Sequence, residues 1–532
     1  MRVMYSEELR KALQQYISVA RKFGPHQAEI IASPECRAAF FEYHYTPFRN
    51  MLVGSDMVVG RRGSGKTSLL NVHSILPYLQ TYHEQPMRSF LQENRLPMKI
   101  MNDRYLSVPL NLADEFVFIN KVIADQNITG SPPIDFLVKF WRLRMLDKVR
   151  KTIETYLIQN DMADRFDITQ FHNKLYGVDD VDITEYNHDL ARRLTRALAA
   201  LEKEAIVTVD TVDDQIDLLK HNRNIFGALL KTASEQISAP LERIHFKVAI
   251  PLEAFQETRD AVSNPDKVLF DIIYLNWSAW HLLRIALHRL RLYYFVLRHE
   301  GELARTKEVD LTVRQDVLAF WSKMLPPDIQ SIRGMREPTA TYMLRHTQLI
   351  PRQLIMILNR AALLSHPFQD NNELRLTEQS IREASNEVDK TNAEACLGQF
   401  EKKYSGIQNL VATYLKNVPR FGDYKQYHRA WAKGSYARRF REICRPLERP
   451  DNFDGFLQLL WEIGVVGRCS DSNSGSYVVG EFRFNIDSDL QATERNRLCV
   501  HPMFSRAWRC IEIENDHRGV LPVGTDAYSS EE

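Results

Sequence analysis

Short apolar runs of strand length alternate with longer stretches of helical periodicity in the first half of the chain. The runs lie at residues 57–59, 105–110, 205–209 and 246–250. Strands that alternate with helical stretches predict a parallel sheet with helices on both faces, which is an α/β fold. A helical pattern over 136–157 separates the second run from the third, and it predicts a helical insertion at about 112–190.

The second half of the chain has a different pattern. After about residue 265 the strand-like runs stop, and helical spacing covers 271–298, 313–325, 340–364 and 377–390. Farther on, a helical segment at 453–463 precedes a strand candidate at 477–484. We therefore predict four parts: an N-terminal helical segment at 1–50, an α/β core at 51–265, a helical lid at 266–395 and a mixed C-terminal domain at 396–532.

The segment between the first strand and the following helix carries the clearest chemical signal. Its residues, Gly60-Arg61-Arg62-Gly63-Ser64-Gly65-Lys66-Thr67, fit the GxxxxGK[ST] pattern of a phosphate-binding loop. Glycines let the backbone close around a phosphate, so that N–H groups point at the ligand. We expect Lys66 to bridge the β- and γ-phosphates of ATP and Thr67 to coordinate Mg²⁺. The residues expected to contact the nucleotide are Gly60, Arg61, Arg62, Gly63, Ser64, Gly65, Lys66, Thr67 and Ser68. The alternative is a glycine turn that only caps a helix.

Three acids are candidates to complete this site. Asp210 ends the third apolar run, which predicts its carboxylate at the carboxyl edge of the sheet as a second Mg²⁺ ligand, unless it is a plain turn residue. Asp213 could orient the attacking water, or it could cap the helix that begins near Ile216. Glu253 follows the fourth run and could sense the γ-phosphate, or it could be a solvated residue at a helix start.

Two arginines of the predicted lid could reach the nucleotide as sensors. They are Arg345 and Arg352. For Arg352 the alternative is a surface charge at the start of a helix, since it follows Pro351. With Lys66, Asp210 and Asp213, Arg352 makes up the predicted catalytic set.

Charge must be considered locally in this chain. It holds 69 Lys and Arg residues against 68 Asp and Glu, a formal net charge of +1, so that nucleic-acid binding would need a local patch. One such stretch is 424–445, where basic residues are interleaved with Tyr427, Trp431, Tyr436 and Phe440. This combination suits phosphate contact plus base stacking on DNA. The alternative is a solvated helix face whose aromatic side chains belong to the core.

Several other classes are disfavoured by the composition. A hydrophobic content of 44% and a charged content of 26% are typical of a folded globular chain. The most apolar long stretch, 272–297, is interrupted by His and Arg, so we expect no membrane span. The first residues include Glu7 and Glu8 and lack the apolar run of a secretory signal, so we expect a cytoplasmic protein. The six cysteines form no CxxC or CxxxC pair, so we expect reduced thiols and no zinc site.

Taken together, these features resemble a known group, the AAA+ and STAND-type signalling ATPases, especially bacterial stand-alone members found in antiviral defence. The resemblance covers most of the chain and rests on the phosphate loop, the strand and acids at 207–214 and the lid segment at Pro351 and Arg352. It implies that ATP binds between a mononucleotide core and a helical lid, and that the C-terminal domain is a winged helix. The helix 453–463, its cap Gly464 and the strand 477–484 are similar to that domain in their order.

We interpret the chain as an ATP-binding and ATP-hydrolysing regulatory switch that acts through a partner protein or a homo-oligomer. Many hydrolytic relatives carry Glu where this chain has Thr211, which favours slow turnover. The alternative is a DNA-binding ATPase of initiator, loader or transposition-regulator type that uses 424–445. A small-molecule kinase shares the same loop, but the additional helices are more typical of a lid and a partner surface.

Overall fold

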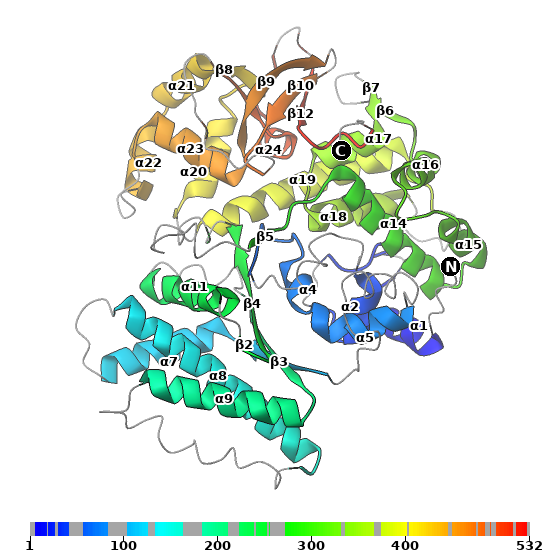
Figure 1. The fold of residues 1–532 in the computed structure, drawn as a ribbon. Helices are drawn as coiled ribbons and strands as arrows, with labels where there is room; N and C mark the ends of the chain where they lie inside the picture. The colour runs from blue at the N-terminus through cyan, green and yellow to red at the C-terminus, as the bar shows by residue number, and fades with distance from the viewer. Residues whose placement is uncertain are drawn as a thin grey trace. The chain divides into compact units, whose positions relative to one another are not determined.

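The computed structural model describes residues 6–18, 20–26, 30–41, 57–82, 104–125, 133–162, 183–210, 223–238, 241–252, 255, 272–330, 336–365, 374–401, 404–444, 450–474, 477–484, 490, 496–513, 516 and 518–528. Contacts group the chain into two units (Figure 1). Ile31–Leu275 form the core unit, whereas Tyr5–Ile30 and Asn276–Glu532 form the C-terminal unit. The sequence predicts a break at residue 265 and a separate segment 1–50; the contacts place the break after residue 275 and attach residues 5–30 to the C-terminal unit.

The core unit is built on a five-stranded parallel sheet with the order β2-β3-β4-β1-β5. The strands are β1 (Met57–Gly60), β2 (Tyr105–Leu110), β3 (Glu204–Asp210), β4 (Ile244–Pro251) and β5 (Ile272–Tyr274). Because β4 pairs Ala249 with Asp210 and Pro251 with Gly60, the carboxyl ends of β1, β3 and β4 share one edge of the sheet. β1 and β4 are nearly buried throughout, as expected for parallel strands covered on both faces.

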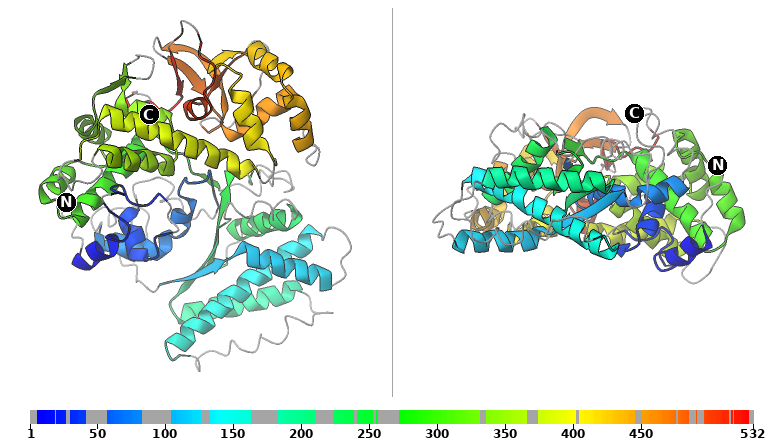
Figure 2. Two further views of the ribbon diagram at one scale, coloured as in Figure 1. Left: turned by 180° about the vertical axis from the view of Figure 1, so that it is seen from behind. Right: turned by 60° about the horizontal axis from the view of Figure 1, so that its bottom comes forward.

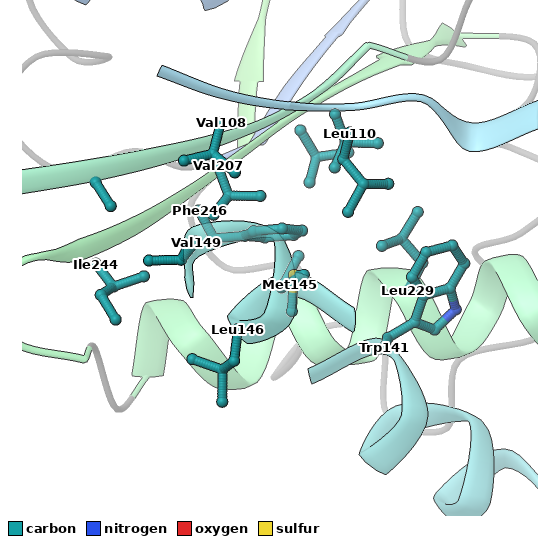
Figure 3. Close-up of a cluster of buried hydrophobic side chains, with 14 of the residues drawn as sticks. Val108, Leu110, Trp141, Met145, Leu146, Val149, Val207, Leu229, Ile244 and Phe246 are labelled. Carbon is teal, nitrogen blue, oxygen red and sulfur yellow. The ribbon is translucent and has the colours of Figure 1, made fainter. Parts of the chain in front are cut away.

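Helices cover both faces of this sheet (Figure 2). One face carries α7 (Leu112–Asp125), α8 (Ile134–Gln159), α9 (Ile183–Ala200) and α11 (Arg223–Ser238), and the other carries α2 (Pro34–Phe40), α4 (Lys66–Leu70) and α5 (Val72–Tyr82). On the first face, Met145 and Val149 of α8 lie beside Val207 and Phe246 of the sheet (Figure 3). Trp141 of α8 contacts the neighbouring helix, where its Nε1 donates a hydrogen bond to the carbonyl oxygen of Ile225 in α11. This packing explains why the segment between β2 and β3 is helical: its apolar stripe covers the sheet.

The C-terminal unit begins with a set of helices. They are α1 (Glu7–Leu13), α14 (Ala279–Val296), α15 (Glu300–Lys307), α16 (Arg314–Met324), α17 (Thr339–Arg345), α18 (Pro351–Ser365) and α19 (Glu378–Glu401), with a ribbon of β6 (Asp328–Gln330) and β7 (Arg336–Pro338). The helix predicted over 271–298 starts later than expected, because residues Ile272–Tyr274 form β5. The Ser278 hydroxyl then caps α14 by accepting a hydrogen bond from the backbone N–H of His281.

The rest of this unit has the order of elements of a winged helix. The elements are α20 (Ile407–Leu415), β8 (Phe421–Asp423), α21 (Tyr424–Lys433), α22 (Tyr436–Cys444), α23 (Phe453–Ile463), β9 (Val466–Ser474), β10 (Tyr477–Glu481), β11 (Arg497–Val500), α24 (Pro502–Ala507) and β12 (Gly519–Pro522). The antiparallel β9 and β10 form the wing, inside a sheet of order β12-β10-β9-β11-β8. The predicted helix at 453–463 and its cap Gly464 are confirmed. The chain thus has the predicted fold class: an α/β P-loop core, a helical lid and a winged-helix-like domain.

Among the helices of the described ranges, none has both the length and the apolar character needed to cross a membrane.

Candidate nucleotide-binding site

The predicted phosphate loop lies at the carboxyl edge of the core sheet, between β1 and α4. Gly65 adopts the left-handed conformation, with φ of 100°, and it directly precedes α4. A Cβ atom at Gly60 would lie 2.6 Å from Oγ of Ser64 and 3.0 Å from Cβ of Leu275. The loop therefore needs glycine at both of its ends, as a tight phosphate-binding turn does.

Lys66 points back into this loop. Its side chain is buried, and Nζ donates hydrogen bonds to the carbonyl oxygens of Gly60 and Arg61, each over 3.0 Å. An ammonium group held by loop carbonyls lies where a phosphate enclosed by the loop could take over its hydrogen bonds. Ser64 is also buried, while Arg61, Arg62 and Ser68 are partly exposed.

Thr67 and Asp210 meet across 143 positions of the sequence. The Thr67 hydroxyl, in the first turn of α4, donates a hydrogen bond of 2.7 Å to Oδ2 of Asp210, at the end of β3. The contact forms because α4 begins, and β3 ends, at the same edge of the sheet. A hydroxyl and a carboxylate are hard oxygen donors, and they suit Mg²⁺, which takes few protein ligands and completes its shell with water and phosphate oxygens. The described ranges hold no group of three or more His, Cys, Asp or Glu side chains suited to a metal.

The remaining predicted site residues include Asp213, Glu253 and Arg352. Asp213, Thr211 and Glu253 lie outside the described residues. Arg352 belongs to the C-terminal unit, where its Nε donates to the carbonyl oxygen of His26 over 3.3 Å, and its sensor role stays a prediction.

Arg345, the second candidate sensor, is part of a buried ion pair. Its Nε and Nη2 donate to the two carboxylate oxygens of Glu337 over 2.8 and 2.7 Å. The Arg345 side chain is 7% exposed and that of Glu337 is 0% exposed. Burial alone lowers the pKa of Arg345, but the Glu337 carboxylate more than offsets this and raises the pKa above its ordinary value. The Tyr477 hydroxyl of the wing strand β10 also donates to Glu337, over 3.0 Å, so Glu337 joins Arg345 to the wing.

Sequence reasoning missed Asn71, which ends α4 directly after the phosphate loop. Its Nδ2 donates to the carbonyl oxygen of Thr67 over 2.8 Å, and the backbone N–H of Asn71 donates to the same oxygen over 3.2 Å. The side chain thereby fixes the turn that carries the Thr67 hydroxyl. The signal was available, since Asn is favoured where a helix ends.

Charged residues at the opposite edge of the core sheet form a separate network. Glu204 accepts hydrogen bonds from Arg104 (2.6 Å) and contacts Nε2 of His245 (2.9 Å). The hydrogen bond with His245, and then those with Arg104, lower the pKa of Glu204 to about 2 despite its burial. These groups lie at the amino ends of β2, β3 and β4, so they stabilise the sheet and take no part in the phosphate site.

The basic stretch at 424–445 divides into a buried and an exposed half. Tyr427, Trp431, Tyr436 and Phe440 are buried, and Trp431 stacks on Phe456 of α23 with ring centres 4.6 Å apart. The base-stacking part of the DNA prediction is therefore wrong, because these rings belong to the domain core. The basic residues are exposed, namely Lys425, Arg429, Lys433, Arg438, Arg439 and Arg441, while Arg445 lies outside the described residues. Arg441 donates to Asp451 over 2.7 Å, so part of its charge is already paired.

No family model matches the chain, and no curated protein matches it by sequence. Solved structures of low similarity include the Orc2 protein of Aeropyrum pernix in ADPNP and ADP complexes, with 13% identity, a TM-score of 0.36, and coverage of 86% of this chain and 87% of that one. The ADP form of the same protein matches with 12% identity and a TM-score of 0.27, over 86% and 87% of the two chains. Cdc6p of Pyrobaculum aerophilum matches with 11% identity and a TM-score of 0.26, over 92% and 96%. The function proposed below therefore rests on the residues of this chain.

Proposed function

We propose that the protein is an ATPase of the AAA+ type that binds ATP with Mg²⁺ at residues 60–68 and hydrolyses it slowly as a regulatory switch. The observation that carries the proposal is the contact between Thr67 and Asp210 beside the buried Lys66. This arrangement brings the phosphate loop, the Lys66 ammonium group and two candidate metal ligands to one edge of a parallel sheet. Nucleotides bind at that edge in open α/β folds.

In this proposal the side chains divide the work at the phosphates. Lys66 exchanges the carbonyl oxygens of Gly60 and Arg61 for phosphate oxygens, which neutralises charge that grows as the γ-phosphate leaves. Thr67 and Asp210 would hold Mg²⁺, which supplies positive charge to the same phosphates. Asp213 is the proposed water-orienting residue and Arg352 the proposed sensor. Thr211, where hydrolytic relatives carry Glu, supports slow turnover.

The output of such a switch would pass through the C-terminal unit. Within this unit, buried polar contacts join the lid to the winged helix. Nε2 of Gln348 donates to the carbonyl oxygens of Ile463 and Gly464, over 3.3 and 3.4 Å. Nε2 of His501 lies 3.1 Å from the carbonyl oxygen of Thr347. A lid joined in this way would carry the winged helix with it and present it to a partner protein or a second copy. Antiviral defence is the setting that the sequence resemblance suggests, and the ATPase proposal does not depend on it.

The test of nucleotide binding is Lys66→Ala. The loss of two charge-assisted phosphate contacts should weaken ATP binding by roughly a hundredfold or more, measured by isothermal titration calorimetry. Lys139→Ala is the matched control, because Lys139 is an exposed lysine of α8 in the same unit. Thermal unfolding of both variants checks the fold. A correctly folded Lys66→Ala protein that binds ATP as tightly as the parent would refute the phosphate-loop assignment.

A second function, DNA binding, is supported by the exposed basic residues of α21 and α22. Exposed basic side chains that line one helical pair suit backbone phosphates, which carry most of the affinity for DNA. Changing Arg429, Arg438 and Arg439 together to Glu should weaken duplex binding and flatten the plot of log affinity against log salt by about three, since each phosphate contact adds about 0.9 to the slope.

Fluorescence anisotropy with a labelled duplex at several salt concentrations measures this effect. The control replaces Arg192, Arg193 and Arg196 by Glu, an equal charge change on exposed residues of α9 in the core unit. Equal losses in both triple variants would indicate a general charge effect. If the parent shows no salt-dependent binding at all, the DNA function is refuted, and the switch that acts on a protein partner is left.

A further inference from the structure

Two cysteines lie side by side in the sheet of the winged-helix-like domain. Cys469 is on β9 and Cys499 is on the neighbouring strand β11, where it pairs with Gly467. Cys469 pairs with Gly480 of β10 on its other side. Since directly opposed and alternate residues share a face, both sulfur atoms lie on the same face of the sheet.

Gly480, which lies next to this pair, leaves room for the sulfur atom of Cys499. A Cβ atom at Gly480 would lie 2.7 Å from Sγ of Cys499, closer than two such atoms can approach. Any other residue at Gly480 would therefore push Cys499 away from the position beside Cys469. The absence of a side chain at Gly480 thus leaves the space that the Cys499 sulfur atom and the Phe482 ring occupy.

The two thiols differ in accessibility and in acidity. Of the six cysteines, all of which fall within the described ranges, Cys469 is partly exposed and the other five are buried. A hydrogen bond from the Cys499 thiol lowers the pKa of Cys469 against the opposing effect of burial, and the charges of Arg497 and Arg518 lower it further, while Asp423 raises it. Burial, and then the same hydrogen bond, raise the pKa of Cys499 well above its ordinary value. Cys469 is thus the more accessible thiol of the pair and the one with the lowered pKa.

The two arginines are held close to this position by an aromatic ring. The guanidinium groups of Arg497 and Arg518 lie 6.0 and 5.6 Å from the centre of the Phe421 ring. Arg518 is further fixed by Asp516, to which it donates over 2.7 Å. A partly exposed thiol with two positioned cations beside it and a second thiol behind it is the arrangement found around redox-active cysteines.

We propose that Cys469 and Cys499 form a redox-active pair that a hydroperoxide converts to a reversible disulfide. The Cys469 thiolate attacks the terminal oxygen of the hydroperoxide, the O–O bond breaks, and Cys469 becomes a sulfenic acid while the leaving oxygen takes a proton. The Cys499 sulfur then attacks the sulfenic sulfur, the S–S bond forms, and the hydroxyl leaves as water with the Cys499 proton. With hydrogen peroxide, two thiols and one peroxide give one disulfide and two waters, and a dithiol reductant restores both thiols.

Formation of the disulfide would also change the geometry of the wing. Diagonal residues on neighbouring antiparallel strands have Cα atoms about 7–8 Å apart, whereas a disulfide needs less than about 7 Å, so closure must shift β9 against β11. The ladder between β9 and β10 already contains an irregular register at Val478 and Gly480. We expect the shift to be taken up there, at the base of the wing.

The test begins with the parent protein, which needs no substitution. Limited alkylation with iodoacetamide and peptide mapping should label Cys469 at least about tenfold faster than any buried cysteine. Treatment with hydrogen peroxide should yield an intramolecular disulfide between Cys469 and Cys499, seen by non-reducing peptide mapping and reversed by dithiothreitol. Labelling of all cysteines at similar rates, or a disulfide at another pair, would overturn the proposal.

Three variants separate the roles of the two thiols. In Cys499→Ser the sulfenic acid on Cys469 should persist and be trapped by dimedone. The Cys469→Ser protein should not be oxidised at low concentrations of hydrogen peroxide. Cys36→Ser, at a buried cysteine of the core unit, should behave as the parent. If Cys499→Ser fails to fold, the mapping of the parent still decides between the outcomes. A folded Cys499→Ser protein that forms no dimedone adduct would overturn the order of attack.

Discussion

Replacing Glu337 by Gln should destabilise the C-terminal unit by about 3 kcal/mol, because breaking a buried ion pair by removing one partner leaves a buried charge uncompensated. The expected loss is this large because both partners are buried. Arg345 keeps 7% of its side-chain surface exposed and Glu337 keeps none, and two parallel hydrogen bonds join them. Glutamine retains the shape but brings an N–H₂ group against the guanidinium donors. Nucleotide affinity should not change, because the role argued here for Arg345 is to stabilise the fold through its ion pair with Glu337.

Urea unfolding of the full chain, followed by intrinsic fluorescence, measures the change. The matched control is Glu387→Gln, which removes one partner of an exposed pair with Arg360 and should cost under about 1 kcal/mol. Replacing Glu337 by Leu together with Arg345 by Met should recover most of the loss, since both charges then leave the interior. A loss below about 1 kcal/mol in Glu337→Gln, or a specific loss of ATP binding, would refute the structural role of this pair.

Two further predictions concern the core unit. Asp210→Asn should keep nucleotide binding but lower Mg²⁺-dependent ATP hydrolysis by roughly a hundredfold or more, since the carboxylate beside Thr67 is neutralised. A phosphate-release assay measures the rate of hydrolysis. Full turnover in this variant would mean that another acid holds the metal. Glu204→Gln should lower the free energy of unfolding at neutral pH by up to about 3 kcal/mol, because the pKa of Glu204 falls from 4.5 to about 2 on folding. That contribution to the free energy of unfolding is complete above pH 4.5 and is lost as the pH falls toward 2. In urea unfolding, the free energies of the parent and the variant should therefore converge in acid. A difference that stays constant with pH would contradict the assignment.

The arrangement of the proposed phosphate site could be predicted from sequence because its parts follow from local pattern and sheet geometry. A glycine-rich turn after a buried strand marks the loop, and the carboxyl ends of parallel strands meet at one edge. These two rules were enough to place Asp210 near Thr67, although 143 residues separate them.

Features that depend on distant packing could not be predicted in this way. β5 has three residues, and its apolar run merges with the pattern of the following helix, so that Ser278 was the only local sign of the boundary. The aromatic rings of α21 and α22 have the same spacing whether they face DNA or a core. Phe456 on α23 decides the matter for Trp431 by stacking on it. For Arg345, the partner Glu337 lies eight residues away, and Glu337 also accepts a hydrogen bond from the wing residue Tyr477, which is distant in sequence.

The attachment of residues 5–30 to the C-terminal unit has a consequence for synthesis on the ribosome. Leu9 and Leu13 of α1 are fully buried, and α1 packs on α14, whose residues are translated long after it. The whole core unit emerges in between. At about 5–20 residues per second, the delay before residue 276 is on the order of ten to fifty seconds. During that time the core can fold, while the apolar face of α1 stays exposed because α14 has not yet been synthesised. We therefore expect nascent chains to need protection of this segment, and truncations before residue 276 to leave it exposed.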